Sequence, residues 1–207
     1  MNTDELKRSF LAFREQCVWL RCCYNTYAAL YESGSEVREV LSASANIFFG
    51  DLNRILIEYC WLQMCKITDS ATSSGRKNLT VEHINSLLES SSLMTDEISC
   101  HSEGLQQYRN LIEKGRHRLV AHLDKESVIN GVPIGEHDQK DITAFFENLQ
   151  GYVDAVGITV GVGPLDFRSP AGSGDVTDLI NRLRSLTTAA SMSESSPHPP
   201  LSLKGRG

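Results

Sequence analysis

The stretch DELKRSFLAFREQCVWLRCCYNTYAALY, residues 4–31, predicts the start of the fold. Its large apolar side chains recur in alternating steps of four and three residues, which keeps them on one stripe of an α-helix. The stripe consists of Leu6, Phe10, Phe13, Cys17, Leu20, Tyr24, Tyr27 and Tyr31. This spacing predicts one long helix with a single buried face.

A second long helix is predicted directly after the first. Ser33-Gly34-Ser35 breaks the first pattern, and helical spacing then resumes at Val37, Leu41, Phe48, Leu52, Ile55, Tyr59 and Leu62. Two long helices joined by so short a turn are expected to lie antiparallel.

The next elements are a loop and two further helices. Residues 68–77 are polar and lack periodicity, which predicts a loop. Thr80 is placed to cap a short third helix that ends in the serines at 90–92, and Thr95 is placed to cap a fourth. The seam of the fourth helix repeats every seven residues, as two series: Ile98, Leu105, Ile112 and Leu119, and His101, Tyr108, Gly115 and His122.

The remaining sequence predicts a fifth helix, a short sixth one and a tail. Ile142, Phe145, Leu149, Tyr152 and Val156 share one helical face, and Asp175 is placed to cap a last short helix. The fold class is therefore all-α. We expect an antiparallel bundle of about five helices over residues 4–166, a C-terminal extension with a short helix over 167–190, and a disordered tail over 191–207.

Composition limits the classes of function. The formal net charge of -6 disfavours a general nucleic-acid coat or a polybasic membrane binder, so any RNA contact must be local. No apolar run approaches the roughly 18 residues of a membrane span, and no secretory signal pattern stands at the N-terminus. Six cysteines without a Cys-x-x-Cys pair are typical of reduced, buried thiols, so we expect a cytoplasmic protein.

One short stretch gathers the side chains suited to RNA chemistry. Residues 114–125, KGRHRLVAHLDK, contain four cationic side chains, those of Lys114, Arg116, Arg118 and Lys125. They also contain the imidazoles of His117 and His122. Histidine suits proton transfer near neutral pH, and an arginine can hold two phosphate oxygens at once.

Two separated blocks resemble the HEPN superfamily, in its branch of type U abortive-infection proteins. The first is Asp69 followed by Arg76-Lys77-Asn78-Leu79-Thr80, and the second is 116–125, RHRLVAHLDK. The second block has the superfamily motif of arginine, a polar residue, a variable stretch and histidine. Here the polar residue is His117, where asparagine or aspartate is more usual. The resemblance extends over residues 4–187.

The resemblance implies a helical bundle that forms a homodimer through its motif helices, so that two motifs meet in one cleft. It also implies a metal-independent endoribonuclease of a toxin-antitoxin or phage-defence system in bacteria, with an antitoxin protein as a possible partner and no cofactor. Arg116, His117 and His122 are then the candidate catalytic residues. Lys114, Arg118, Lys125 and Arg109 are the candidate RNA-binding residues. The alternative is a catalytically inactive HEPN-like dimer that binds RNA or a protein partner as a scaffold.

Helical geometry raises a second alternative within the motif. Six residues at about 100° each place Arg116 and His122 about 240° apart around a helix, whereas Arg118 and His122 share a face. The motif predicts that Arg116 matters more than Arg118, and simple facing predicts the reverse. A two-fold interface would allow the motif pair to converge even though one helix does not.

Structural roles compete with the functional ones. His122 could be a core histidine, and the cations near it could complement the negative end of the helix dipole. His117, His122 and Asp124 spread around the helix, which disfavours a zinc site. Residues 157–163, GITVGVG, lack the lysine of a phosphate-binding loop. The aromatic stripe that includes Trp19 and Tyr24 indicates core or dimer packing rather than base stacking.

Overall fold

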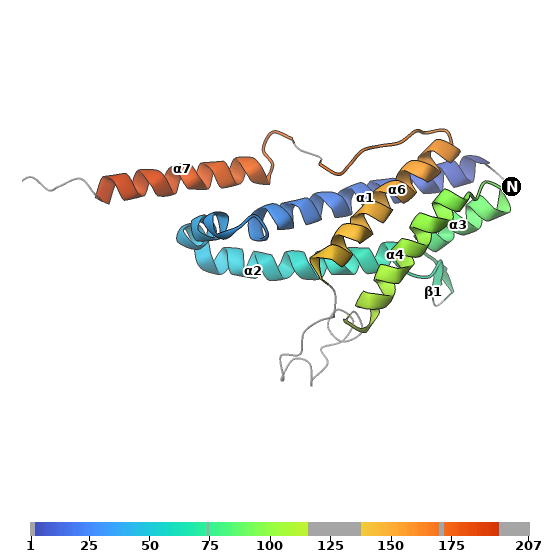
Figure 1. The fold of residues 1–207 in the computed structure, drawn as a ribbon, viewed down its shortest axis with the longest axis horizontal. Coiled ribbons are helices and arrows are strands. Elements are labelled where there is room, and N and C mark those ends of the chain that lie inside the picture. The colour runs from blue at the N-terminus through green and yellow to red at the C-terminus, as the bar shows by residue number, and fades with distance from the viewer. Residues whose placement is uncertain (1–2, 74, 116–137, 170–171, 195–207) are drawn as a thin grey trace, which may run out of the picture.

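The computed structural model describes residues 3–73, 75–115, 138–169 and 172–194, and within these ranges the protein is an all-α bundle (Figure 1). Six helices lie there: α1 (Thr3–Tyr31), α2 (Ser35–Thr68), α3 (Val81–Ser90), α4 (Asp96–Gly115), α6 (Gln139–Thr159) and α7 (Val176–Glu194). The strands β1 (Thr72–Ser73) and β2 (Arg76–Lys77) form one small antiparallel hairpin. The predicted fold class is confirmed.

Helices α1 and α2 form the long antiparallel pair that the spacing predicts (Figure 1). The turn between them passes through Gly34, whose φ of 105° lies in the left-handed region that favours glycine. The α1 stripe is buried as expected from Leu6 to Tyr24, and Leu6, Phe10, Phe13 and Leu20 are at most 1% exposed. Tyr24 stacks on Phe146 with ring centroids 4.5 Å apart.

A kink in α2 overturns the predicted stripe of that helix. Ala45 has φ -162° and ψ 74°, so the helix is interrupted there. Phe48 and Ile55, predicted to face inward, are each 60% exposed, and Phe49 and Trp61 are buried instead. Because the kink rotates everything after it, a single stripe drawn from Val37 to Leu62 does not describe the buried face.

Capping residues place the starts of three later helices, as predicted. The backbone N–H of His83 donates to Thr80 Oγ1 at 3.2 Å, and that of Ile98 donates to Thr95 Oγ1 at 3.3 Å. The backbone N–H of Thr177 donates to the Asp175 carboxylate at 2.8 Å. Each cap satisfies a backbone donor that the helix itself leaves without a partner.

Helices α4 and α6 pack against each other (Figure 1). A Cβ on Gly151 of α6 would lie 2.4 Å from the His101 ring, and a Cβ on Gly104 of α4 would lie 2.5 Å from the Asn148 amide. The two polar side chains meet, since His101 Nδ1 and Asn148 Oδ1 are 3.1 Å apart. Each glycine therefore leaves room for a polar side chain of the other helix.

The principal core fills the space between α1, α2, α3, α4 and α6. The seam of α4 is buried where described, with Ile98 and Leu105 at 0% exposure and Ile112 at 1%. On α6, Phe145, Leu149 and Tyr152 are at most 1% exposed. None of the described helices has the length and apolar character needed to cross a membrane.

The C-terminal helix α7 packs on a second, smaller core at the α1–α2 turn. Its Ile180 is buried with Leu30, Val37, Leu41 and Phe49. The helix continues to Glu194 and has 19 residues, so it is longer than the short helix predicted and includes the first residues of the predicted tail. The division into a bundle and an extension stays a prediction.

Candidate functional site

Helix α4 leads into the predicted motif, which begins directly after the end of that helix. Helix α4 ends at Gly115, one residue before Arg116. Lys114 lies in its last turn. The predicted site residues Arg116, His117, Arg118, His122 and Lys125 lie outside the described residues. The structure therefore shows the scaffold that carries the motif, and the roles of these residues stay predictions.

Arg109 joins Asp69, the first residue of the loop block, to α4, the helix that precedes the second block. Its Nη2 donates to Asp69 Oδ1 at 2.9 Å, and the two side chains are only 18% and 24% exposed. Arg109 lies two turns before the end of α4, and Asp69 is the residue directly after α2. This half-buried ion pair attaches the loop after α2 to the motif helix. The predicted contact of Arg109 with RNA stays a prediction.

The loop after α2 is held by further hydrogen bonds, which the sequence predicted only as an irregular segment. Asn78 Nδ2 donates to the Ser70 carbonyl at 2.9 Å, and the Asn78 backbone N–H donates to the Ala71 carbonyl at 2.8 Å. The Ala71 N–H donates to Glu82 on α3 at 3.1 Å. The loop is thus a defined structure that spans from α2 to α3, with the β1–β2 hairpin inside it.

Helix α6 resumes the described chain with a strong N-terminal cap. The Asp138 carboxylate accepts from the backbone of Lys140 and Asp141, and the Asp141 carboxylate accepts from the Asp138 backbone N–H, which is a capping box. The Asp138 cap was not predicted, although an acid three residues before another acid is a recognisable signal. The cap fixes the start of α6, the first described helix after α4.

A polar network near the start of α6 fixes that helix to α1. Gln139 Nε2 donates to the Tyr24 hydroxyl at 2.8 Å, and the Tyr24 hydroxyl donates to Glu32 at 3.1 Å. Burial raises the pKa of Tyr24 to about 12, so the hydroxyl stays protonated and can donate. A hollow of about 190 Å³ lies beside this network, between Tyr24, Trp61, Tyr108 and the residues around them.

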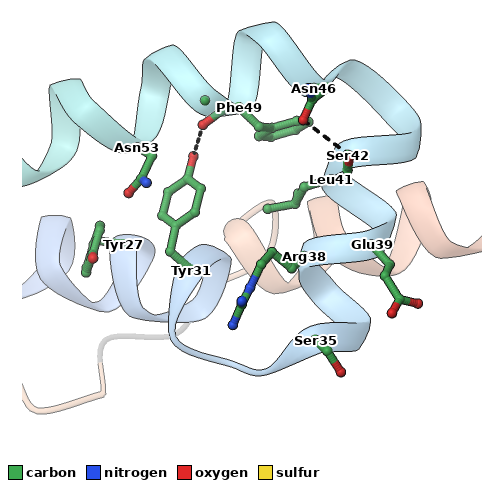
Figure 2. Close-up of a pocket in the computed structure, with 11 residues that line it drawn as sticks. Tyr27, Tyr31, Ser35, Arg38, Glu39, Leu41, Ser42, Asn46, Phe49 and Asn53 are labelled. Carbon is green, nitrogen blue, oxygen red and sulfur yellow. Dashed lines mark hydrogen bonds between the residues drawn. The ribbon is translucent and has the colours of Figure 1, made fainter.

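A larger hollow of about 720 Å³ lies at the α2 kink (Figure 2). The kink is near the start of α2, whereas the hairpin follows the end of that helix. Tyr27 and Tyr31 of α1 face it, and the Tyr31 hydroxyl donates to the Phe49 carbonyl at 2.8 Å. Ser42 Oγ bonds Asn46 Oδ1 across the kink at 3.2 Å. This hollow was not predicted, although the run Ser42-Ala43-Ser44-Ala45-Asn46 is a recognisable signal of a helix that bends.

The protein has six cysteines and several His, Asp and Glu side chains that could in principle bind a metal ion. The six cysteines are free thiols, four of them buried. Within the described ranges no group of three His, Cys, Asp or Glu side chains is placed to hold a metal ion. The ligands weighed from the sequence, His117, His122 and Asp124, lie outside those ranges.

The family comparison agrees with the resemblance that the two sequence blocks indicate. No curated protein and no solved structure matches the chain. Residues 3–179 match the family model HEPN_AbiU2, described as AbiU2. That range covers α1 to α6, the loop block and the whole of the Arg116–His122 motif, and it ends within α7. The chain therefore belongs to the HEPN_AbiU2 family, as the spacing of its motif and its loop block predicted.

Proposed function

We propose that this protein is a metal-independent endoribonuclease of the HEPN type that acts as a homodimer in the bacterial cytoplasm. Its biological role would be that of an effector in phage defence, or of the toxin in a toxin-antitoxin pair with an antitoxin protein. The observation that carries the proposal is the family match over residues 3–179, which includes both the motif and the loop that is tied to the motif helix.

The arrangement of the scaffold supports a site at the end of α4. Helix α4 delivers Arg116 directly after a buried seam that packs on α6, and the capping box at Asp138 anchors the chain where it returns. The Arg109–Asp69 ion pair holds the outer side of the same helix. A rigid base of this kind keeps catalytic side chains in a fixed geometry, which proton transfer and phosphate binding require.

The proposed reaction is the attack of the ribose 2′-oxygen on the adjacent phosphorus. One His122 takes the proton of the 2′-hydroxyl as that oxygen bonds to phosphorus, and the His122 of the second copy gives a proton to the departing 5′-oxygen. Arg116 binds the non-bridging oxygens and stabilises their negative charge, and His117 assists by hydrogen bonding. The products are a 2′,3′-cyclic phosphate and a 5′-hydroxyl, so atoms and charge balance without a metal.

The remaining cations of the stretch have a binding role in this proposal. Lys114, Arg118 and Lys125 contact phosphates on either side of the cleaved bond, and Arg109 contributes from within its ion pair with Asp69. The weak overall affinity expected of a protein with net charge -6 makes these local contacts necessary.

The test is RNA cleavage by the purified protein in excess chelator. We expect single-stranded RNA to yield fragments with cyclic phosphate ends, and we expect His122→Ala to reduce the rate by roughly 100-fold or more, in line with the loss of a general acid–base group. A matched variant, His83→Ala, removes a half-buried histidine of α3 outside the motif and should keep full activity. If the wild-type protein binds the RNA but leaves it intact, and His122→Ala binds with the same affinity, the scaffold alternative is correct and the enzyme proposal is wrong.

A further inference from the structure

Contacts from neighbouring segments hold the β1–β2 hairpin and the loop around it in place. Two strands of two residues each contribute few hydrogen bonds of their own. The segment around them is nevertheless fixed at three points: by Asp69 on Arg109 of α4, by Asn78 on Ser70, and by Ala71 on Glu82 of α3. Gly75 allows the tight reversal with a φ of 77°.

The hairpin presents two cations that the fold does not use. Arg76 and Lys77 form β2, and both side chains are exposed. Neither has an ion-pair partner within the described part of the chain, in contrast to Arg54, Arg109 and Arg168, which pair with carboxylates. The hairpin thus carries two exposed positive charges on a protein whose net charge is -6.

The two acids closest in sequence offset this positive charge only in part. Asp69 accepts from Arg109, and Glu82 accepts from the Ala71 backbone N–H. Lys66 in the last turn of α2 adds a third exposed positive charge at the same end of that helix. The local charge is therefore opposite in sign to the overall charge, which favours the approach of a polyanion to this end of the molecule.

We propose that the β1–β2 hairpin is an RNA-binding arm in which Arg76 and Lys77 bind backbone phosphates of the substrate outside the cleavage site. This inference rests on the proposed function and adds a binding surface to it. An arginine can grip a phosphate through two parallel hydrogen bonds, and a lysine binds it as a point charge. Such contacts fix the register of a nucleic acid on a protein without reading its sequence.

The ion pair between Arg109 and Asp69 links the RNA-binding arm to the helix that precedes the motif. It attaches the loop that carries the hairpin to α4 at a point six residues before Gly115, which is about 9 Å along the helix axis at 1.5 Å per residue. The arm and the motif helix are thus held in one frame. An RNA strand bound at the hairpin would enter the site with a defined offset from the scissile phosphate.

The experiment compares two charge reversals of equal size. The test variant is Arg76→Glu/Lys77→Glu, with Arg76→Gln/Lys77→Gln as a milder version. The control is Arg38→Glu/Arg182→Glu, which changes the same charge on two exposed residues, Arg38 of α2 and Arg182 of α7. Both are close in sequence to residues of the second core, Val37 and Ile180. Binding of labelled single-stranded RNA is measured by anisotropy across a salt series, in a His122→Ala background that keeps the RNA intact.

We expect the hairpin variant to weaken binding by about tenfold and to lower the slope of log affinity against log salt by about 1.4, because each lost phosphate contact on a single strand removes about 0.7. The control should change the slope by much less. In protein that retains His122 and therefore cleaves RNA, the hairpin variant should raise KM more than it lowers kcat.

Two results overturn the inference in distinguishable ways. If both charge reversals weaken binding equally while the parent protein still cleaves RNA, the hairpin has no special role and the proposed function stands. If the parent protein neither binds nor cleaves RNA, the proposed function and the arm fall together. Circular dichroism of each variant shows that the helical bundle is intact.

Discussion

Arg109 on α4 and Asp69 after α2 form an ion pair of 2.9 Å although 40 residues separate them in the chain. Their side chains are 18% and 24% exposed, so solvent screens the pair only in part. This contact places the loop block of the family beside the motif helix.

We predict that this pair stabilises the fold measurably. Asp69→Ala and Arg109→Ala should each lower the free energy of unfolding by about 1–3 kcal/mol, between the ranges for exposed and buried pairs. The double variant should lose less than the sum of the two. A double-mutant cycle in urea checks this, and a coupling energy near zero would show that the two side chains act independently.

We predict that the α4–α6 contact depends on Gly151. Gly151→Ala should lower the free energy of unfolding by about 1–3 kcal/mol, because the added Cβ would lie 2.4 Å from the His101 ring and the gain in helix propensity is only about 1 kcal/mol. Gly50→Ala is the matched control. It lies within α2 with no atom within 4 Å of an added Cβ, and it should stabilise the protein by roughly 0.5–1 kcal/mol. Equal effects at both sites would contradict the close approach.

We predict that the protein loses stability at alkaline pH. Burial raises the pKa of Cys60 to about 12 and that of Cys17 well above its ordinary value of 9.0, and it raises the pKa of Tyr152 well above 10.0. These groups stay protonated in the native state and ionise first in the unfolded chain. The stability they contribute is therefore complete below pH 9 and is lost as pH rises through the native pKa values.

Urea unfolding at pH 8 and pH 10 measures this loss, which should be about 1 kcal/mol at pH 10 for each of Cys17 and Cys60. Cys100→Ala should leave the pH dependence unchanged because Cys100 is exposed. Cys60→Ala should reduce it. An unfolding midpoint that does not move between the two pH values would show that the thiols are not protected in the native state.

We predict that Arg116 matters more for cleavage than Arg118. The motif assigns phosphate stabilisation to Arg116, so Arg116→Ala should lower kcat by about 100-fold or more, as the loss of a group that stabilises transition-state charge does. Arg118→Ala should act mainly on KM. The reverse order would favour the simple facing of Arg118 and His122 on one helix, and it would indicate a site built within one subunit.

The sequence determined much of the fold because its signals are local. The seven-residue seam of Ile98, Leu105 and Ile112 predicted the buried face of α4, and Thr80, Thr95 and Asp175 predicted three helix starts. Periodicity and capping depend on residues within a turn or two of each other, so they can be read without a partner in view. The pair Arg116 and His122 was predicted instead from a resemblance to the HEPN motif, and its catalytic role stays a prediction.

Only the tertiary structure decided the features that depend on distant residues. The kink at Ala45 exposes Phe48 and Ile55, because the buried face of α2 after the kink is set by packing on α1 and α4 rather than by its own spacing. The pairing of Arg109 with Asp69 and of Gly151 with His101 joins residues 40 and 50 positions apart. Contacts of that range leave no periodic trace in a single sequence, because they arise only when the bundle closes and each side chain meets the helix opposite.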